Sequence, residues 1–451
     1  MWQTLAPELV LEIFQHFFPG LTLSVTEPAL FPWYLGHICS TWRNVLISSP
    51  HFLNSLTINL GEKGKGVCQR RYARFKRTLA IVRFCMQSSN DHAISFRLAL
   101  RWPELCYNLK RTSQSRFCRL ILQSIVGQSA RWRDAYITLH ASEMPILYAA
   151  KDQLQMLRSI KLELMDSCDS CAWDLCIARP SPPFSDLLAN TPQLARVYVG
   201  HYLDWEIDWS SIRAIHLKCP PSPDAFLELL QHVDCLEELA IYGPSSSRAP
   251  PHRRGPLITL PFLKILRIGD ADFLPLLETQ MLDELSVRND IHSLDSSTFN
   301  AAVSSFLPSL HRLRKLSLFS NDAYDAEVLF QHMPDIQDLF LYVYEASWLN
   351  QLATCPRVHR LKTLTLGLPC TASNMTALTA CMEPKPGPSL IDSFTELGHF
   401  SLELYNPIDT RFCTPVAESL ERSFKELGVP CAIQSVNRIA TPDAKFASFE
   451  L

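Results

Sequence analysis

Several features that would point to an enzyme or a membrane protein are missing from this sequence of 451 residues. No stretch approaches the roughly 20 uninterrupted apolar residues that a membrane helix needs. The motifs G-x-S-x-G and H-E-x-x-H are absent, and no strand-like segment precedes a G-x-G-x-x-G. The sequence therefore predicts no catalytic residues, no cofactor and no enzymatic activity of its own. An enzyme on a related α/β fold remains an alternative, and it would need a deep pocket with convergent polar groups.

Charge is also scarce, and neither sign dominates. Charged residues make up 19% of the chain and the net charge is −3 at pH 7, which gives no overall field that attracts nucleic acid or an acidic membrane. We therefore expect neither partner. Residues 1–20 lack a basic segment and carry Glu8 and Glu12, which argues against a secretory signal. We expect the protein in the cytoplasm or nucleus.

One cysteine group raises the question of a metal site. The 15 cysteines are scattered, but Cys168, Cys171 and Cys176 lie close together. A Cys-x2-Cys pair is half of a zinc site, and a structural site needs four ligands. No second pair follows, because Cys219 stands alone. We therefore favour a cysteine-bearing loop and expect no metal.

What the sequence does contain is a repeat. The pattern L-x-x-L-x-L, with Leu, Ile, Val or Phe at the apolar positions, occurs ten times at an average spacing of about 27 residues. The repeats begin at Leu157, Leu194, Ile212, Leu236, Leu263, Leu282, Leu313, Ile336, Leu361 and Leu397. Two earlier segments, 93–98 and 134–139, fit less well and are expected, with 55–60, to start the array.

The period predicts both the elements and their arrangement. Apolar residues at the fourth and sixth positions indicate a short strand with one buried face. Helical patterns lie between the strands, so we expect an α/β fold in which parallel strands stack into a right-handed leucine-rich-repeat solenoid. A compact α/β domain with a conventional sheet is the less favoured alternative. The expected helices are 223–233, 273–280, 297–313, 326–333 and 348–352, with 416–427 at the end of the array.

The repeat also predicts a binding surface. The third, fifth and seventh positions of each unit face away from the buried side, so they line the concave sheet. Aromatic and arginine side chains are enriched among interface hot spots, and we expect this row to bind a protein target. It comprises Tyr198, His216, Lys218, Tyr242, Arg267, Arg288, Lys315, Phe319, Phe340 and Tyr342. The alternative is that these side chains pack on one another.

The first fifty-odd residues carry four further motifs. They are Leu-x-Pro-Glu-Leu from Leu5, Ile13-Phe14, Cys-x-x-Trp-Arg from Cys39, and Ser-Pro-x-Phe-Leu from Ser49. Residues 4–55 thereby resemble an F-box, and with the repeats the chain is similar to fungal F-box/leucine-rich-repeat proteins. One departure is Ala6, where F-boxes often have the proline that here follows as Pro7.

The resemblance implies a partner and a function. F-boxes dock on the Skp-type adaptor of SCF (cullin–RING) ubiquitin ligases, so the chain is expected to be a substrate-recognition subunit in the ubiquitin-conjugation pathway. The alternative is a repeat scaffold without a ligase role, with residues 1–55 as a helical cap and Trp42 in its core. The residues implied to contact the adaptor are Leu5, Pro7, Leu9, Ile13, Phe14, Ile38, Cys39, Trp42 and Leu46.

The remaining segments complete the expected organisation. Residues 69–86 predict a basic amphipathic helix, for which a solvated face is favoured over a patch for nucleic acid or a phosphorylated ligand. We expect an F-box-like module over 1–55, a linker with this helix over 56–92, the solenoid over 93–404, and a cap and tail over 405–451.

Overall fold

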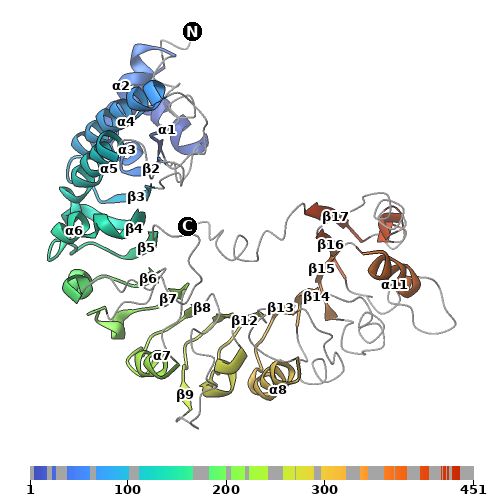
Figure 1. Ribbon diagram of the computed structural model, residues 1–451. Coiled ribbons are helices and arrows are strands. Elements are labelled where there is room, and N and C mark those ends of the chain that lie inside the picture. Colours follow the sequence, from blue (N-terminus) through green and yellow to red (C-terminus); the bar gives the residue numbers. More distant parts are fainter. Residues whose placement is uncertain are drawn as a thin grey trace. The chain divides into compact units, whose positions relative to one another are not determined.

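A computed structural model shows the chain as two compact units, residues 1–212 and 213–451 (Figure 1). Each unit is an α/β stack of its own. The structure describes residues 5–17, 23–26, 38–60, 68–100, 111–165, 182–199, 205–218, 223–241, 257–269, 271–288, 296–320, 336–343, 360–369, 371–382, 397–405, 418, 420–422, 424–425 and 429–436.

The first unit is built on parallel strands that pair in chain order. The strands are β1 (Leu23–Ser24), β2 (Ser55–Asn59), β3 (Ile94–Ala99), β4 (Trp132–His140), β5 (Ser159–Met165) and β6 (Arg196–Val199). The helices are α1 (Pro7–Phe17), α2 (Ser40–Ser48), α3 (Pro50–Leu53), α4 (Cys68–Ser88), α5 (Arg111–Val126) and α6 (Met144–Leu147), with 3-10 turns η4 (Ser129–Arg131), η5 (Ala141–Glu143), η6 (Tyr148–Ala150), η7 (Pro182–Leu188) and η8 (Trp209–Ser211).

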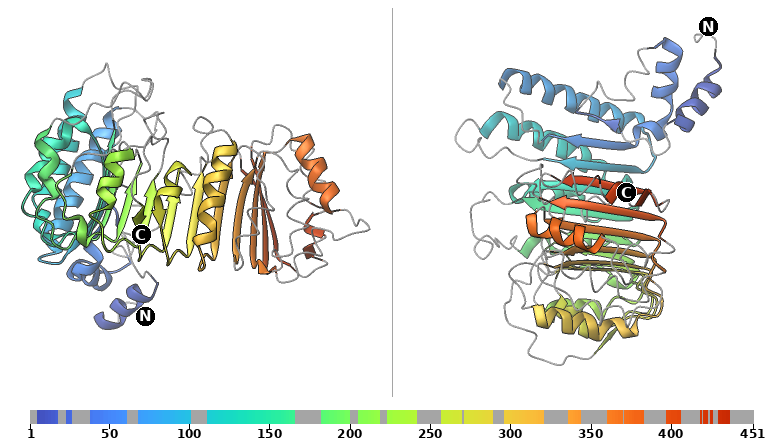
Figure 2. Two further views of the ribbon diagram at one scale, coloured as in Figure 1. Left: turned by 90° about the horizontal axis from the view of Figure 1, so that it is seen from below. Right: turned by 90° about the vertical axis from the view of Figure 1, so that its right-hand side faces the viewer.

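The second unit repeats the arrangement, with its strands side by side and its helices along their outer side (Figures 1 and 2). The main strands are β7 (Ala214–Leu217), β8 (Glu238–Ile241), β10 (Ile265–Ile268), β12 (Glu284–Arg288), β13 (Lys315–Ser320), β14 (Asp338–Val343), β15 (Thr363–Pro369), β16 (His399–Tyr405) and β17 (Cys431–Val436). The helical segments are α7 (Pro223–Leu230), η9 (Ala271–Leu276), α8 (Ser296–Phe306), η10 (Leu307–Ser309) and α11 (Ala372–Met382), and β9 (Ile258–Thr259) pairs with β11 (Leu277–Glu278).

The repeat pattern accounts for the core. All three apolar positions of each of the ten repeats are buried, and the neighbouring main strands pair in parallel. Equivalent residues are partners, as in Leu239↔Leu266 and Leu285↔Leu316. The predicted α/β class, with parallel strands alternating with helices as in a leucine-rich-repeat solenoid, is confirmed.

The second position of the repeat carries a row of charges on the strand-entry side of the second unit. Glu237 N donates to Arg213 O (2.8 Å), Lys264 N to Glu237 O (2.8 Å), Asp283 N to Lys264 O (2.9 Å) and Arg314 N to Asp283 O (2.9 Å). The side chains alternate in sign along this backbone row. Lys264 Nζ lies 2.7 Å from Glu237 Oε2, and Arg213 Nη1 lies 3.4 Å from Glu237 Oε1. Opposite charges on neighbouring strands stabilise this pairing register.

Some predicted elements differ from the structure. The helix expected over 273–280 is wrong: η9 is a short 3-10 turn that contains Pro275, and the chain then enters β11. The helix expected over 297–313 ends at Phe306, where a 3-10 turn containing Pro308 follows, because proline removes a helical N–H donor. Strands β1, β9, β11 and β17 were not predicted. The helices expected over 326–333 and 348–352, and half of the residues of 416–427, lie outside the described residues.

Candidate functional site

The N-terminal helices pack around an aromatic core, which we call the helical module (α1, α2 and α3). Phe14 is its centre: its ring meets Trp42 edge-on at 5.3 Å between centroids and Phe52 at 5.6 Å. Val10 of α1 and Val45 and Leu46 of α2 complete the buried cluster. The apolar spacing of α1 and α2 therefore serves, in the first place, to hold this module together.

The structure sorts the residues that the F-box resemblance singles out. Phe14, Trp42 and Leu46 are buried in the core, with 1%, 7% and 3% exposure. Leu5, Ile13 and Cys39 are half-buried and pack against the core. By contrast, Pro7, Leu9 and Ile38 are exposed, the last two at 49% each. Sequence reasoning missed one residue of this exposed kind, Ile47 at 41%.

The sheet of the second unit has one face turned away from its helices, which we call the outward sheet face. This face carries a chain of ion pairs that crosses strands β7 to β13. Arg267 stands at its centre, with Nη1 2.6 Å from Glu238 Oε1 and Nη2 2.9 Å from Glu284 Oε1. His216 Nε2 lies 3.3 Å from Glu238 Oε1, and Lys315 Nζ lies 3.2 Å from Glu284 Oε2. We call these five residues the ion-pair chain.

Burial and charge act against each other on Glu238. Partial burial by itself raises the pKa of this carboxyl, but the hydrogen bond from His216 and the charges of His216 and Arg267 outweigh it, so the pKa lies below its ordinary value. Glu238 is therefore ionised at neutral pH. Arg267, only 11% exposed, is held between two carboxylates, so its guanidinium is part of the structure before any ligand arrives.

An aromatic cluster follows on strands β13 and β14. Phe319 packs against Phe340 with 4.9 Å between ring centroids, and its ring is stacked on Tyr342 at 6.4 Å. Phe319 is 9% exposed, while Phe340 and Tyr342 are half-buried. The alternative that these side chains pack on one another therefore holds for this cluster, which still presents two partly open aromatic rings.

The other predicted face residues are distributed as follows. Tyr198 belongs to the first unit, where Lys161 Nζ lies 4.0 Å above its ring. Arg288 is half-buried on β12 and Lys218 is exposed beyond β7, while Tyr242 lies outside the described residues. The structure thus joins His216, Arg267 and Lys315 in one network and the three β13–β14 aromatics in another.

Sequence reasoning missed the partners of this row. Glu238 and Glu284 occupy the third position of their repeats and so share the outward face. In the first unit, Thr138 Oγ1 donates to Glu163 (3.0 Å) and Arg97 lies over Tyr136. The signal for the contacts of Arg267 is present in the sequence. Glu238 and Glu284 occupy the third position of their repeats and Arg267 the fifth, so all three side chains share one sheet face and lie diagonally opposite on neighbouring strands.

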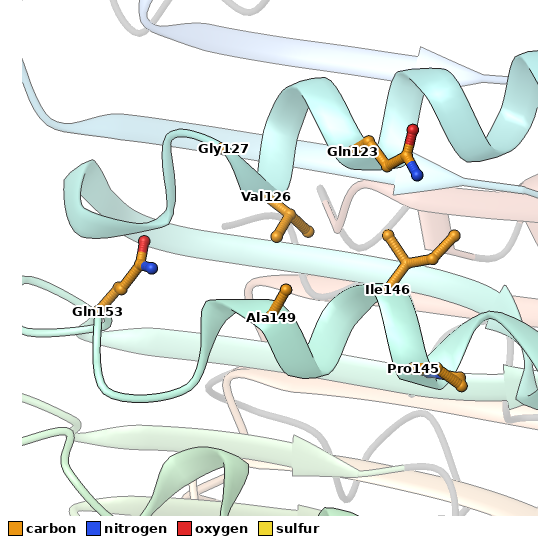
Figure 3. Close-up of a pocket in the computed structure, with 7 residues that line it drawn as sticks. All are labelled: Gln123, Val126, Gly127, Pro145, Ile146, Ala149 and Gln153. Carbon is orange, nitrogen blue, oxygen red and sulfur yellow. The ribbon is translucent and has the colours of Figure 1, made fainter.

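The hollow in the first unit has no catalytic character. It measures about 570 Å³ and lies between α5 and the α6–η6 segment (Figure 3). Its lining consists of Gln123, Val126, Gly127, Pro145, Ile146, Ala149 and Gln153. None of these seven residues has an ionisable or nucleophilic side chain, so the hollow supplies neither an acid nor a base.

The described residues contain neither a metal-binding cluster nor a membrane-spanning helix. No group of three or more His, Cys, Asp or Glu side chains in that part of the chain is arranged to hold a metal ion, and Cys168, Cys171 and Cys176 lie outside it. None of the described helices is both long and apolar enough to span a membrane.

Burial raises the pKa of the Cys85 and Cys118 thiols to about 12, so neither is a nucleophile at neutral pH.

Comparison with known proteins adds no family. No model of a known protein family matches the chain, and no curated protein matches it at a significant level. The F-box-like resemblance of residues 4–55 therefore rests on its four motifs and their order.

Proposed function

We propose that this chain recruits protein targets to an SCF-type ubiquitin ligase, with the helical module docking on a Skp-type adaptor. The observation that carries the proposal is the exposure of Leu9, Ile38 and Ile47 around a closed aromatic core. They are three of the six exposed large apolar side chains of the described residues, with Leu9 and Ile47 on the helical module and Ile38 two residues before α2. A concentration of this kind is typical of an interaction surface.

In this role the chain is a substrate adaptor and contributes no catalytic group, and it acts in the cytoplasm or nucleus. The outward sheet face holds the target, with the ion-pair chain and the β13–β14 aromatics as contact points. Holding the target beside the ligase raises the effective concentration of its lysines for ubiquitin transfer.

A second function is favoured by one observation. Strand β1 lies within the F-box-like segment and pairs with β2, with Leu23 opposite Leu56, and Val25 N donates to Thr57 O at 2.9 Å. The segment is thus hydrogen-bonded into the sheet, as a cap of a repeat array would be. The chain would then be a protein-interaction scaffold without a ligase role.

The two functions are separated by the affinity of the full chain for a purified Skp-type adaptor, measured by calorimetry. The test variant is Leu9→Ser with Ile38→Ser, since both side chains are exposed and their removal leaves the core intact. The matched control is Leu257→Ser with Phe262→Ser, which removes exposed apolar side chains (58% and 56%) from the second unit.

The adaptor role predicts binding by the wild type and by the control. If each exposed side chain contributes about 1 kcal/mol at the interface, the test variant binds about thirtyfold more weakly. Absence of binding by the folded wild-type chain would leave the scaffold function. Equal binding by the test variant would remove these two residues from the interface.

A further inference from the structure

Helices α4 and α5 have an unusual charge composition. The 21 residues of α4 include six basic side chains and the 16 residues of α5 include three, and neither helix contains Asp or Glu. The chain as a whole has a net charge of −3. Positive charge is therefore concentrated in these two helices, and the net charge of the whole chain does not reveal it.

The two helices lie side by side along the outer side of the first unit (Figure 1). Phe75 of α4 and Phe117 of α5 are stacked, with 6.4 Å between centroids and 9° between ring planes. Leu79 and Val82 of α4 and Ile121 of α5 are buried. The apolar faces thus point toward the neighbouring elements, and the basic side chains are left on the outside.

Four exposed cations define what we call the basic helical face: Lys76, Arg77 and Arg83 of α4 and Arg116 of α5. Arg119 is also half-exposed, but its Nε lies 3.0 Å from Glu143 Oε2, so its charge is already paired. Lys76 and Arg83 are about 10 Å apart along the helix axis, and packed helices lie 8–10 Å apart. The face is therefore an extended patch and not a pocket for one small anion.

We propose that the basic helical face binds the phosphate backbone of a double-stranded nucleic acid without reading its sequence. Arginine, which makes up three of the four cations, binds phosphate oxygens through paired N–H donors. The other exposed side chains described on α4 are Ala73, Ala80 and Gln87, while Phe75 and Phe117 are half-buried and stacked on each other. The described part of this face therefore offers no fully exposed aromatic ring on which an unpaired base could stack.

The same composition disfavours a membrane. An interfacial helix needs large apolar side chains that enter the bilayer, and none of the exposed large apolar residues lies on the described part of α4 or α5.

The expectation that the chain binds no nucleic acid rested on the net charge and on α4 alone. The packing of α5 beside α4, which the sequence did not show, changes that conclusion. The proposal does not depend on the adaptor role.

The number of cations fixes the expected salt dependence. Four phosphate contacts give a slope of about −3.6 in a plot of log affinity against log salt concentration, from about −0.9 per contact on a B-form duplex. Raising the salt from 50 to 200 mM should therefore weaken binding about 150-fold.

The test measures binding of the full chain to fluorescent duplexes of DNA and RNA, of unrelated sequences, by anisotropy at several salt concentrations. Poly-glutamate is added as a competitor that represents an acidic protein, and phosphatidylserine vesicles represent an acidic membrane. The test variant changes four residues: Lys76→Gln, Arg77→Gln, Arg83→Gln and Arg116→Gln. The matched control removes the same charge from exposed positions of the second unit: Arg312→Gln, Lys362→Gln, Arg422→Gln and Lys425→Gln.

The proposal expects sequence-independent duplex binding with a slope near −3.6, lost in the test variant and kept in the control, with circular dichroism showing both folded. Equal loss in both variants would mean that net charge alone is responsible and would overturn it. Competition by poly-glutamate at equal charge concentration, or preference for the vesicles, would overturn it in favour of an acidic protein or a membrane. Preference between DNA and RNA identifies the source of the duplex.

Discussion

Replacement of Arg267 tests whether the outward sheet face is held together by its charges. The Arg267 side chain joins strands β8, β10 and β12 through Glu238 and Glu284. In Arg267→Met the apolar stem is kept and the guanidinium is lost, so the effect reports the ion pairs and not the packing.

The expected loss of stability in Arg267→Met depends on the ion pairs that remain. Removing one partner of a buried ion pair costs about 3–5 kcal/mol, because the other charge stays buried. Here Glu238 keeps His216 and Glu284 keeps Lys315, and the carboxylate side chains are 21% and 17% exposed. We therefore expect a loss of about 2–3 kcal/mol. Arg267→Lys keeps the charge but loses the paired donors, and should lose about 1 kcal/mol.

Hydrogen exchange read by mass spectrometry is the suitable assay, because it resolves local opening in an array that has two units. Peptides covering β8 to β12 should lose protection in Arg267→Met, while those covering β2 to β4 of the first unit should not change. The pH dependence supplies a second readout. Since the pKa of folded Glu238 is lowered, its stabilising contribution is present above its ordinary pKa and is lost as the pH falls through the lowered value.

The wild type should therefore lose more protection than Arg267→Met as the pH falls from 7 to below the lowered pKa of Glu238, and the gap between them should narrow. A loss under about 0.5 kcal/mol at pH 7, as is typical of surface changes, would refute the claim that these charges hold the face together. A gap of the same size at both pH values would show that lost packing, and not lost ion pairing, is responsible.

Two further predictions concern buried groups. Trp42→Ala removes a 7%-exposed ring packed on Phe14 and should destabilise the helical module by about 3–5 kcal/mol. Limited proteolysis should then cut the chain first within residues 5–53. Resistance to the protease equal to that of the wild type would show that the ring is not part of the core. Among the described cysteines, exposed Cys235 should react with a maleimide at pH 7.5. Burial raises the pKa of Cys85 and Cys118 to about 12, so these thiols should react only after unfolding. Peptide mapping measures the labelling, and labelling of either buried thiol in the folded protein would contradict the prediction.

The sequence predicted the strands well because their signal is local. The triplet Leu282–Leu285–Val287 and its nine counterparts show which side chains are buried without reference to any neighbour. Strand β1 has only two residues, so it carries no alternation that could reveal it.

The candidate sites were less predictable because they depend on neighbours. Leu9 and Phe14 are equally apolar in sequence, and only the packing of α1 on α2 decides that one is exposed and the other buried. The partners of Arg267 lie 29 and 17 residues away in sequence, and their contact depends on strand register. The basic helical face likewise required α5 to be placed beside α4.

The alternating charges at the second repeat position bear on how such an array can grow or shrink. Loss of the repeat that carries Glu237 would bring Arg213 beside Lys264, and loss of the next would bring Glu237 beside Asp283. Like charges on neighbouring strands are destabilising by about 0.2–1 kcal/mol. Loss or duplication of two adjacent repeats keeps opposite signs together. Between Arg213 and Arg314, the structural unit is thus one repeat, whereas the unit that gene duplication or deletion can exchange without an electrostatic penalty is a pair.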